Sequence, residues 1–239
     1  MLRITNDRLT LLKLLAVASM VIDHYNKFAN PDYSQIMFSV GRLALPIFVF
    51  VLAFNLSRIE AAKMPRIAVR LVFFGLLATP AYNSMGGTIL GGWWPLNVLF
   101  LLGGLVGVVY LLTLPVARRW PLYGYRFLAA LLFLFAGALA EFFWVGLGLG
   151  LVAWRLFVLF SRGENMGDKG RGEIAFLSLA AAGLTALLCV INGNGWALAA
   201  IPVVLVVLWI PAVKLPRFKW FFYWFYPAHL CALWLIDKV

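Results

Sequence analysis

Apolar segments of nearly membrane-spanning length follow one another along almost the whole chain. A helix needs about 20 apolar residues to cross the hydrocarbon core of a bilayer. By that rule the sequence predicts about nine transmembrane helices, at residues 9–29, 35–57, 66–83, 95–114, 126–144, 145–161, 174–192, 196–213 and 220–237. The fifth and sixth segments meet at "AEFFWVGLGLG", which could form a tight turn or a re-entrant piece. We expect an all-α, polytopic membrane protein in which residues 1–239 form one transmembrane bundle without a separate soluble domain.

Composition supports the same interpretation. The 239 residues are 64% hydrophobic and only 12% charged, whereas soluble domains average about 25% charged residues. A soluble fold of this length could not bury so many apolar side chains. The two cysteines, Cys189 and Cys231, both lie in apolar runs. Their positions fit neither a disulfide framework nor a metal site, so we interpret them as small buried hydrophobic residues.

The basic residues are distributed unevenly over the predicted connections. The net charge is +11, from 20 basic and 9 acidic residues. Seventeen of the basic residues fall at one side of the predicted bundle: Arg3, Arg8, Lys13, Arg58, Lys63, Arg66, Arg70, Arg118, Arg119, Arg126, Arg155, Arg162, Lys169, Arg171, Lys214, Arg217 and Lys219. The positive-inside rule then predicts a cytoplasmic N-terminus and an external C-terminus. The excess charge therefore indicates topology and contact with membrane lipids, and we expect no nucleic-acid partner.

Once the charges of the loops and of the span ends are set aside, four ionisable residues stand out as intramembrane: Asp23, His24, Arg42 and His229. Such residues are costly in a membrane and usually face the bundle interior or a wet cavity. At 1.5 Å per residue, His24 lies roughly 22 Å from the cytoplasmic start of the first span, and Arg42 lies roughly 10 Å below the outer surface. Both positions fall in the outer third of the core, so the two residues can meet. His229 lies roughly 14 Å above the cytoplasmic end of its span, and tilt could bring it to the others. Glu141 is a weaker case, since it could lie at the outer surface.

These positions suggest different roles for neighbouring residues. Asp23 and His24 are adjacent and point about 100° apart on a helix, so Asp23 is expected to pair with Arg42 while His24 faces a cavity. Histidine is a natural proton acceptor near neutral pH, and arginine suits a phosphate, a carboxylate or a developing oxyanion. Pro46 frees the carbonyl of Arg42 from helical hydrogen bonding, which predicts a kink beside the guanidinium.

The same residues are also compatible with purely structural roles or with transport. The Asp23–Arg42 pair could be an interhelical salt bridge that only stabilises the fold, and each histidine could simply bond a neighbouring helix. A proton-coupled transporter would use similar groups, although no internal repeat supports alternating access. Two histidines and an aspartate could bind zinc, but no closely spaced ligand pair is present, and we expect no metal.

The stretch "DHYNKF…VGRLALPIFVFVLAFNLSR" resembles the TraX family of conjugal-transfer membrane proteins, especially its TrbP branch. The resemblance also includes "GGWWPLN" and "YPAH" in the last span. It implies a multi-pass protein of the bacterial inner membrane that takes part in maturation of the conjugative pilin for pilus assembly and type IV secretion. It further implies that His24 is the catalytic base and that Asp23, Arg42 and His229 are its partners in the site. Substrate-binding residues are expected at Asn55, Arg58, Arg66, Trp94, Asn97 and Tyr226.

The resemblance implies a transferase and leaves two donors open. In one hypothesis acyl-CoA (acetyl-CoA) binds from the cytoplasm, with its phosphates at Arg58 or Arg66, and His24 activates the pilin amine. In the other, a phospholipid of the outer leaflet donates a glycerol-phosphate head group, whose phosphate binds Arg42. A non-enzymatic pilin chaperone and a transporter are the remaining alternatives.

Overall fold

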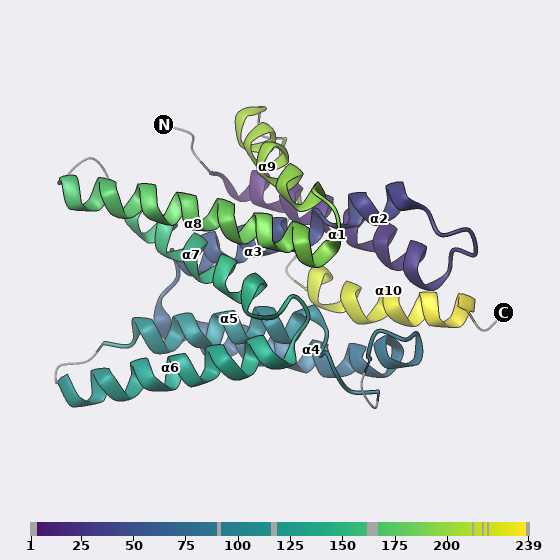
Figure 1. The fold of residues 1–239 in the computed structure, drawn as a ribbon, viewed down its shortest axis with the longest axis horizontal. Coiled ribbons are helices and arrows are strands. Elements are labelled where there is room, and N and C mark those ends of the chain that lie inside the picture. The colour runs from purple at the N-terminus through teal and green to yellow at the C-terminus, as the bar shows by residue number, and fades with distance from the viewer. Residues whose placement is uncertain are drawn as a thin grey trace.

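A computed structural model describes residues 4–89, 92–115, 119–161, 167–211, 213–216, 218 and 220–237. The described part of the chain is a bundle of helices (Figure 1). Its elements are α1 (Asn6–Phe28), α2 (Gln35–Gly41), α3 (Ala44–Leu56), η1 (Ala61–Lys63), α4 (Met64–Ser84), α5 (Val98–Thr113), α6 (Arg119–Leu139), α7 (Phe143–Ser161), α8 (Asp168–Asn192), η3 (Trp196–Ala199), α9 (Ala200–Trp209) and α10 (Phe221–Asp237). No β-strand occurs in these residues, which confirms the predicted all-α class.

The helices reproduce the predicted apolar segments closely. Four described stretches are long and apolar enough to cross a membrane: Gln35–Leu56, Trp120–Leu139, Phe143–Ser161 and Asp168–Asn192. Three shorter apolar helices cover Val98–Thr113, Trp196–Trp209 and Phe221–Ile236. With 23 and 21 residues, α1 and α4 also have the length that a crossing requires. Both helices also carry charged side chains, and those near the end of α1 are Asp23 and Lys27.

The second predicted span is broken. It consists of α2 and α3, and Arg42 and Leu43 form the turn between them. The backbone N–H of Arg42 bonds the carbonyl of Ser39, and that of Leu43 bonds Val40, so the helix tightens before it restarts. Pro46 lies in the first turn of α3, where its missing N–H costs little. The predicted kink is therefore a tightened turn within one span, with Arg42 at its centre.

Glycines allow the central helix α5 to pack closely on its neighbours. A Cβ at Gly104 would lie 2.6 Å from Ala136, and one at Gly107 would lie 2.7 Å from Leu132, both on α6. A Cβ at Gly150 of α7 would lie 2.4 Å from a methyl group of Leu105. Small residues promote close helix packing in membranes by this means. The buried core is consequently continuous from α4 through α5 to α7.

A tight turn at residues 140–142 joins α6 to α7. The predicted fifth span covers residues 126–144, whereas α6 begins at Arg119 and ends at Leu139. The N–H of Leu96 bonds the carbonyl of Leu139 at 2.8 Å, and the N–H of Glu141 bonds the carbonyl of Leu96 at 2.9 Å. These bonds satisfy backbone groups that the end of a helix leaves unpaired. Of the two possibilities left open by the sequence, a tight turn and a re-entrant segment, the structure has the tight turn. The turn holds Glu141 beside the start of α5.

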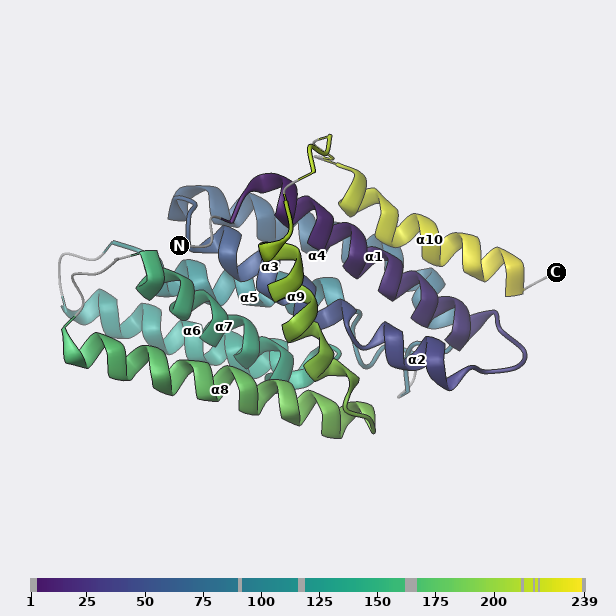
Figure 2. The same ribbon diagram turned by 90° about the horizontal axis from the view of Figure 1, so that it is seen from above.

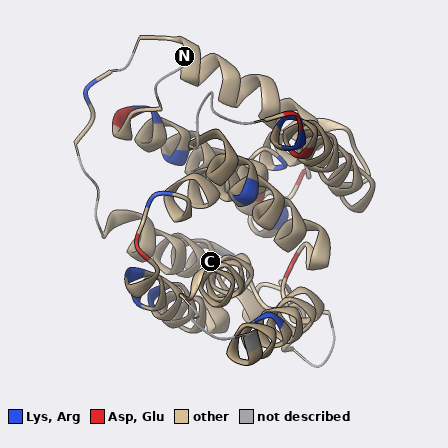
Figure 3. Cartoon of the chain, turned by 90° about the vertical axis from the view of Figure 1, so that its left-hand side faces the viewer, with Lys and Arg blue, Asp and Glu red and all other residues tan. Residues whose placement is uncertain are grey.

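Charge separates the two ends of the bundle. Residues at the end where α1, α4 and α8 begin include Arg8, Lys63, Arg66, Arg70, Lys169 and Arg171. Figure 3 looks onto that end and shows Lys and Arg there together with Asp and Glu. Helices α1 and α10 lie side by side and run toward the opposite end (Figure 2). Arg3, Arg118, Arg162, Arg217, Lys219 and Lys238 lie outside the described residues. The assignment of the basic end to the cytoplasm remains a prediction of the positive-inside rule.

Candidate functional site

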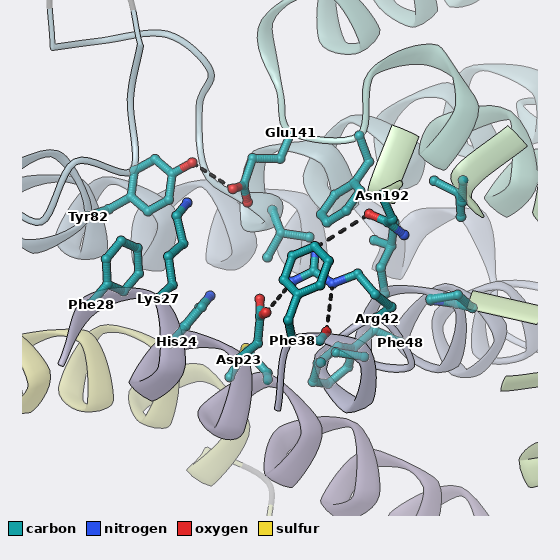
Figure 4. Close-up of a pocket in the computed structure, with 18 of the residues that line it drawn as sticks. Asp23, His24, Lys27, Phe28, Phe38, Arg42, Phe48, Tyr82, Glu141 and Asn192 are labelled. Carbon is teal, nitrogen blue, oxygen red and sulfur yellow. Dashed lines mark hydrogen bonds and ion pairs between the residues drawn. The ribbon is translucent and has the colours of Figure 1, made fainter. Parts of the chain in front are cut away.

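A polar cavity of about 310 Å³ lies at the end of the bundle opposite the basic residues. Its wall includes the last turns of α1, the α2–α3 break, the α6–α7 turn and the end of α8. Asp23, His24 and Lys27 reach it from α1, and Arg42 reaches it from the break (Figure 4). Three of the four ionisable residues singled out by sequence therefore line one space. The fourth, His229, lies directly behind His24.

Arg42 forms an ion pair with Asp23, as their similar predicted depth indicates. The two side chains are only 12% and 14% exposed. The approach is possible because Gly41 faces Asp23: a Cβ at Gly41 would lie 2.3 Å from the Cβ of Asp23. Glycine at position 41 therefore leaves room for the side chain of Asp23, and Arg42, the next residue, forms the ion pair with it.

Two further groups hold the guanidinium of Arg42. Its Nε donates to the carbonyl of Phe38 at 3.2 Å, and its Nη1 donates to Oδ1 of Asn192 at 3.4 Å. The ring of Phe38 lies 4.3 Å from the guanidinium carbon, a distance at which cation–π attraction operates. Asn192 is the last residue of α8. Arg42 therefore ties three separate elements together at the cavity wall.

Polar contacts between α1 and α2 fix the rest of this wall. Ser19 donates its hydroxyl to the carbonyl of Val40 at 2.6 Å. Asn26, which is 2% exposed, accepts from the N–H of Ser34 at 2.6 Å and donates to its carbonyl at 2.9 Å. Buried polar groups are retained where their hydrogen bonds are satisfied. These bonds hold α2 against α1 and so keep Arg42 level with Asp23.

The two histidines form a pair. Nδ1 of His24 lies 2.7 Å from Nε2 of His229, and the rings are nearly parallel, with an interplanar angle of 4°. Nδ1 of His229 lies 3.0 Å from the carbonyl oxygen of Phe225 on the preceding turn. Tyr226 packs edge-on against both rings. The first and last long helices of the chain thus meet through its two histidines.

The carbonyl of Phe225 determines where the protons of the neutral pair lie. A carbonyl oxygen only accepts, so Nδ1 of His229 must carry the proton in that bond. Nε2 of a neutral His229 is then an acceptor, and Nδ1 of His24 must donate to it. This leaves Nε2 of His24 without a proton. The ring that lines the cavity therefore has its basic nitrogen free, and its other nitrogen is held by a second imidazole.

A second acidic group, Glu141, lies in the same cavity. Its Oε1 accepts a 2.6 Å bond from the hydroxyl of Tyr82, which is 1% exposed (Figure 4). From sequence, Glu141 is only a candidate surface residue, and Tyr82, Lys27 and Asn192 are not among the predicted site residues. The α6–α7 turn brings Glu141 inward. The sequence signal that could have indicated this placement is that Glu141 is an acidic residue close to the predicted boundary between two spans.

The six expected substrate-binding residues do not gather around the cavity. Asn55, Arg58 and Arg66 lie at the far end of α3 and the start of α4, and Arg58 covers the ring of Phe54. Trp94 donates its indole N–H to the carbonyl of Ala138 at 2.8 Å. Gly91, the first residue of "GGWWPLN", lies outside the described residues.

The other two positions have structural partners. Asn97 is 1% exposed, donates to the carbonyl of Gly75 at 2.9 Å and caps α5 by accepting from Leu99. Tyr226 is 3% exposed and contacts the histidine pair. Of the six, Tyr226 is therefore the one that lies against the predicted catalytic base.

The cavity combines a proton acceptor, a fixed cation and two carboxyl groups. Among the described residues, no group of three histidine, cysteine, aspartate or glutamate side chains is arranged to hold a metal ion. Nε2 of His24 can take a proton from a nucleophile, and Arg42 can bind an oxyanion or a phosphate. Together these groups can accept a proton and bind an anion.

Comparison with known proteins connects this site to a family. The family model described as "TraX protein" matches residues 8–237. The curated protein named "Protein TraX" from Escherichia coli is 36% identical over 90 residues, which are 38% of this chain and 34% of that relative. No solved structure is detectably similar. With its long apolar helices and a match over almost its whole length, this multi-pass inner-membrane protein belongs to the TraX family.

Proposed function

We propose that the chain is a membrane-embedded transferase that modifies the conjugative pilin, with acyl transfer as the reaction and His24 as the base. The observation that carries this proposal is the histidine pair. It leaves Nε2 of His24 unprotonated in a cavity that also contains Arg42. Pilin as the acceptor comes from the family resemblance.

The reaction has one proton to place and one developing charge to stabilise. The pilin amine attacks the thioester carbonyl of an acyl-CoA, forming the C–N bond while Nε2 of His24 takes the amine proton. The carbonyl oxygen becomes an oxyanion, which the guanidinium of Arg42 in the cavity wall would stabilise. When the C–S bond breaks, the proton passes to the thiolate, giving the acylated pilin and free CoA. General base catalysis of this kind contributes about 10²–10⁴-fold.

His229 can take over the proton that His24 accepts. When His24 receives a proton at Nε2, it can release the proton at Nδ1 to Nε2 of His229, 2.7 Å away. The positive charge then lies on a ring whose Nδ1–H already bonds the carbonyl of Phe225. His229 is accordingly a positioning residue that holds His24 in its basic tautomer and shares its charge.

Intact mass measurement of the pilin tests the proposal. Pilin is isolated from cells that contain the wild-type chain, His24→Ala, His229→Phe, or the control Cys231→Ser, which alters an exposed residue two positions beyond His229. We expect unmodified pilin with His24→Ala, a slower rate of modification with His229→Phe, and the wild-type mass with Cys231→Ser. Purified protein with labelled acetyl-CoA and pilin should transfer the label. Full modification by His24→Ala would refute the role of His24.

A second candidate reaction is transfer of a phospholipid head group. The 13 residues of α3 separate Arg42 from Arg58, a rise of about 20 Å, so a CoA anchored at the basic end must reach far into the bundle. A lipid in the leaflet next to the cavity needs no such reach. A pilin hydroxyl would attack phosphorus while its proton goes to Nε2 of His24. The bond from phosphorus to the diacylglycerol oxygen would break, and that oxygen would take the proton back from His24, so that diacylglycerol leaves. The two adducts differ in mass, so the same measurement separates them.

His24→Ala and a liposome assay address the two remaining alternatives. A chaperone that only presents pilin to other enzymes would support complete maturation with His24→Ala. A transporter would move solute across liposomes that contain no pilin.

A further inference from the structure

A second cavity, which is apolar and is called the crevice below, has a volume of about 470 Å³ and lies beside the polar cavity. Its walls are α7 and α8 on one side and α9 on the other, and α3 forms its floor. The crevice exists because α9 contacts α1 and α3 and turns away from α8 after the short η3 element (Figures 1 and 2). Its volume falls within the range of small-molecule sites, about 300–1,000 Å³.

The crevice opens to the lipid-facing surface of the bundle. Phe160, Ile201 and Leu205 line it and are 50%, 44% and 55% exposed. Its other lining residues are also almost entirely apolar. Inside a membrane, an open apolar space of this kind excludes water because nothing in it can hydrogen-bond. The groups available to fill it are lipid acyl chains.

The crevice and the polar cavity adjoin along the same two helices. Pro46 lines both spaces. On α8, Thr185 lines the crevice, while Leu188 and Asn192, one and two turns further along the same face, line the polar cavity. A chain lying in the crevice thus leads directly toward the guanidinium of Arg42. The change from apolar to cationic surroundings matches the change from acyl chain to phosphate in a phospholipid.

The crevice follows α7 away from the polar cavity. Phe142, just before α7, lines the polar cavity, and the lining of the crevice extends from Leu149 to Phe160, a rise of about 16 Å. An acyl chain that begins at the polar cavity would therefore run along α7 toward the basic end of the bundle. We propose that the crevice binds one acyl chain of a membrane phospholipid, with the lipid phosphate in the polar cavity at Arg42 and Lys27. The lipid would then lie beside His24, as head-group transfer requires, although the binding itself does not depend on any reaction.

Photocrosslinking of a lipid probe tests the proposal without pilin or turnover. The purified chain, in detergent micelles, receives a trace of phospholipid with a diazirine near the end of one acyl chain. After irradiation, labelled peptides are identified by mass spectrometry. We expect labelling on the crevice faces of α7, α8 and α9 that saturates and is displaced by excess unlabelled phospholipid. Uniform labelling of all lipid-facing helices, without saturation, would overturn the proposal.

Two alanines of α8 provide a matched pair of variants. Ala182 lines the crevice, and Ala175 lies on the same helix, exposed and outside it. Ala182→Phe should fill the crevice and remove its label, and Ala175→Phe should leave the wild-type pattern. Because both positions are exposed, neither change overpacks the core, and the unfolding temperature of each variant checks this. Unchanged crevice labelling in Ala182→Phe would contradict the proposal.

A diacylglycerol probe with the same diazirine has the acyl chains but no phosphate, so it distinguishes binding of the acyl chain from binding of the phosphate. The double variant Asp23→Asn with Arg42→Gln removes both members of the ion pair, so neither charge is left without the other. We expect it to lose labelling by the phospholipid probe and to keep labelling by diacylglycerol. If the double variant retained both probes equally, the placement of the phosphate at Arg42 would be wrong. If the wild-type chain modified pilin normally but showed no saturable labelling in the crevice, lipid binding would be wrong and the acyl-CoA reaction would stand, so the two proposals fail separately.

Discussion

Gly41 leaves no room for a side chain, so its replacement by alanine tests how α1 and α2 meet. General helix propensity favours alanine over glycine by about 0.8–1.0 kcal/mol, which would raise stability. The structure predicts the reverse, because the new Cβ would lie 2.3 Å from the Cβ and 2.7 Å from Oδ1 of Asp23. Ordinary contact begins at 3.4 Å, so the helices must separate by about 1.1 Å, the difference between 3.4 and 2.3 Å. Overpacking of this kind costs about 1–3 kcal/mol.

The assay is thermal unfolding in detergent, followed by the fluorescence of the ten tryptophans. At about 2–4 °C per kcal/mol for a chain of this size, we expect Gly41→Ala to lower the unfolding temperature by about 2–12 °C. Gly183→Ala is the control, because it lies in α8 with nothing within 4 Å of the new Cβ, and it should be neutral or stabilising.

Activity should respond to Gly41→Ala as well. Arg42 follows Gly41 directly and would move with it, and a displacement of about 1 Å at a catalytic group can cost about 10²-fold. Pilin modification should therefore slow in Gly41→Ala and remain at the wild-type rate in Gly183→Ala. An unfolding temperature of Gly41→Ala at or above that of the wild type would refute the packing argument.

Three further perturbations follow from the same geometry. Arg42→Gln leaves Asp23 unpaired and should cost about 3–5 kcal/mol, whereas the double change with Asp23→Asn should cost clearly less, as denaturation of both proteins would reveal. Asn97→Ala should lose about 1–2 kcal/mol from its cap and buried hydrogen bond while the folded protein modifies pilin at the normal rate; a selective loss of rate would restore Asn97 as a substrate contact. Gly150→Ala, whose Cβ would lie 2.4 Å from Leu105, should destabilise the fold by about 1–3 kcal/mol, and equal stability in thermal unfolding would show that α5 and α7 can repack.

The membrane-spanning helices could be predicted from sequence because their signal is local. Apolar length and the positions of charged residues are read from a few neighbours, and the helix bounds agree to within several residues at most ends. The Asp23–Arg42 pair was predictable for a related reason. Both residues lie within one helical hairpin, so counting about 1.5 Å per residue placed them at the same depth.

Features that depend on tilt and on turns could not be obtained in this way. Depth counting placed His229 near the middle of the membrane, and only the arrangement of α10 against α1 brings it 2.7 Å from His24. Glu141 is directed inward by backbone bonds between Leu96 and the α6–α7 turn, which no periodicity encodes. The apolar crevice arises from the direction of α9, a property of packing among several helices.

The histidine pair also has a consequence for biosynthesis. Its two members are 205 residues apart, the first in α1 and the second in α10. A ribosome that adds roughly 5–20 residues per second therefore completes Asp23 and Arg42 long before His229 exists. The ion pair can form inside an early hairpin, but the base receives its partner only when the last helix enters the membrane. A chain that stops short of α10 would contain Asp23 and Arg42 but not His229, so we expect the proposed base to be complete only after the final helix has been made.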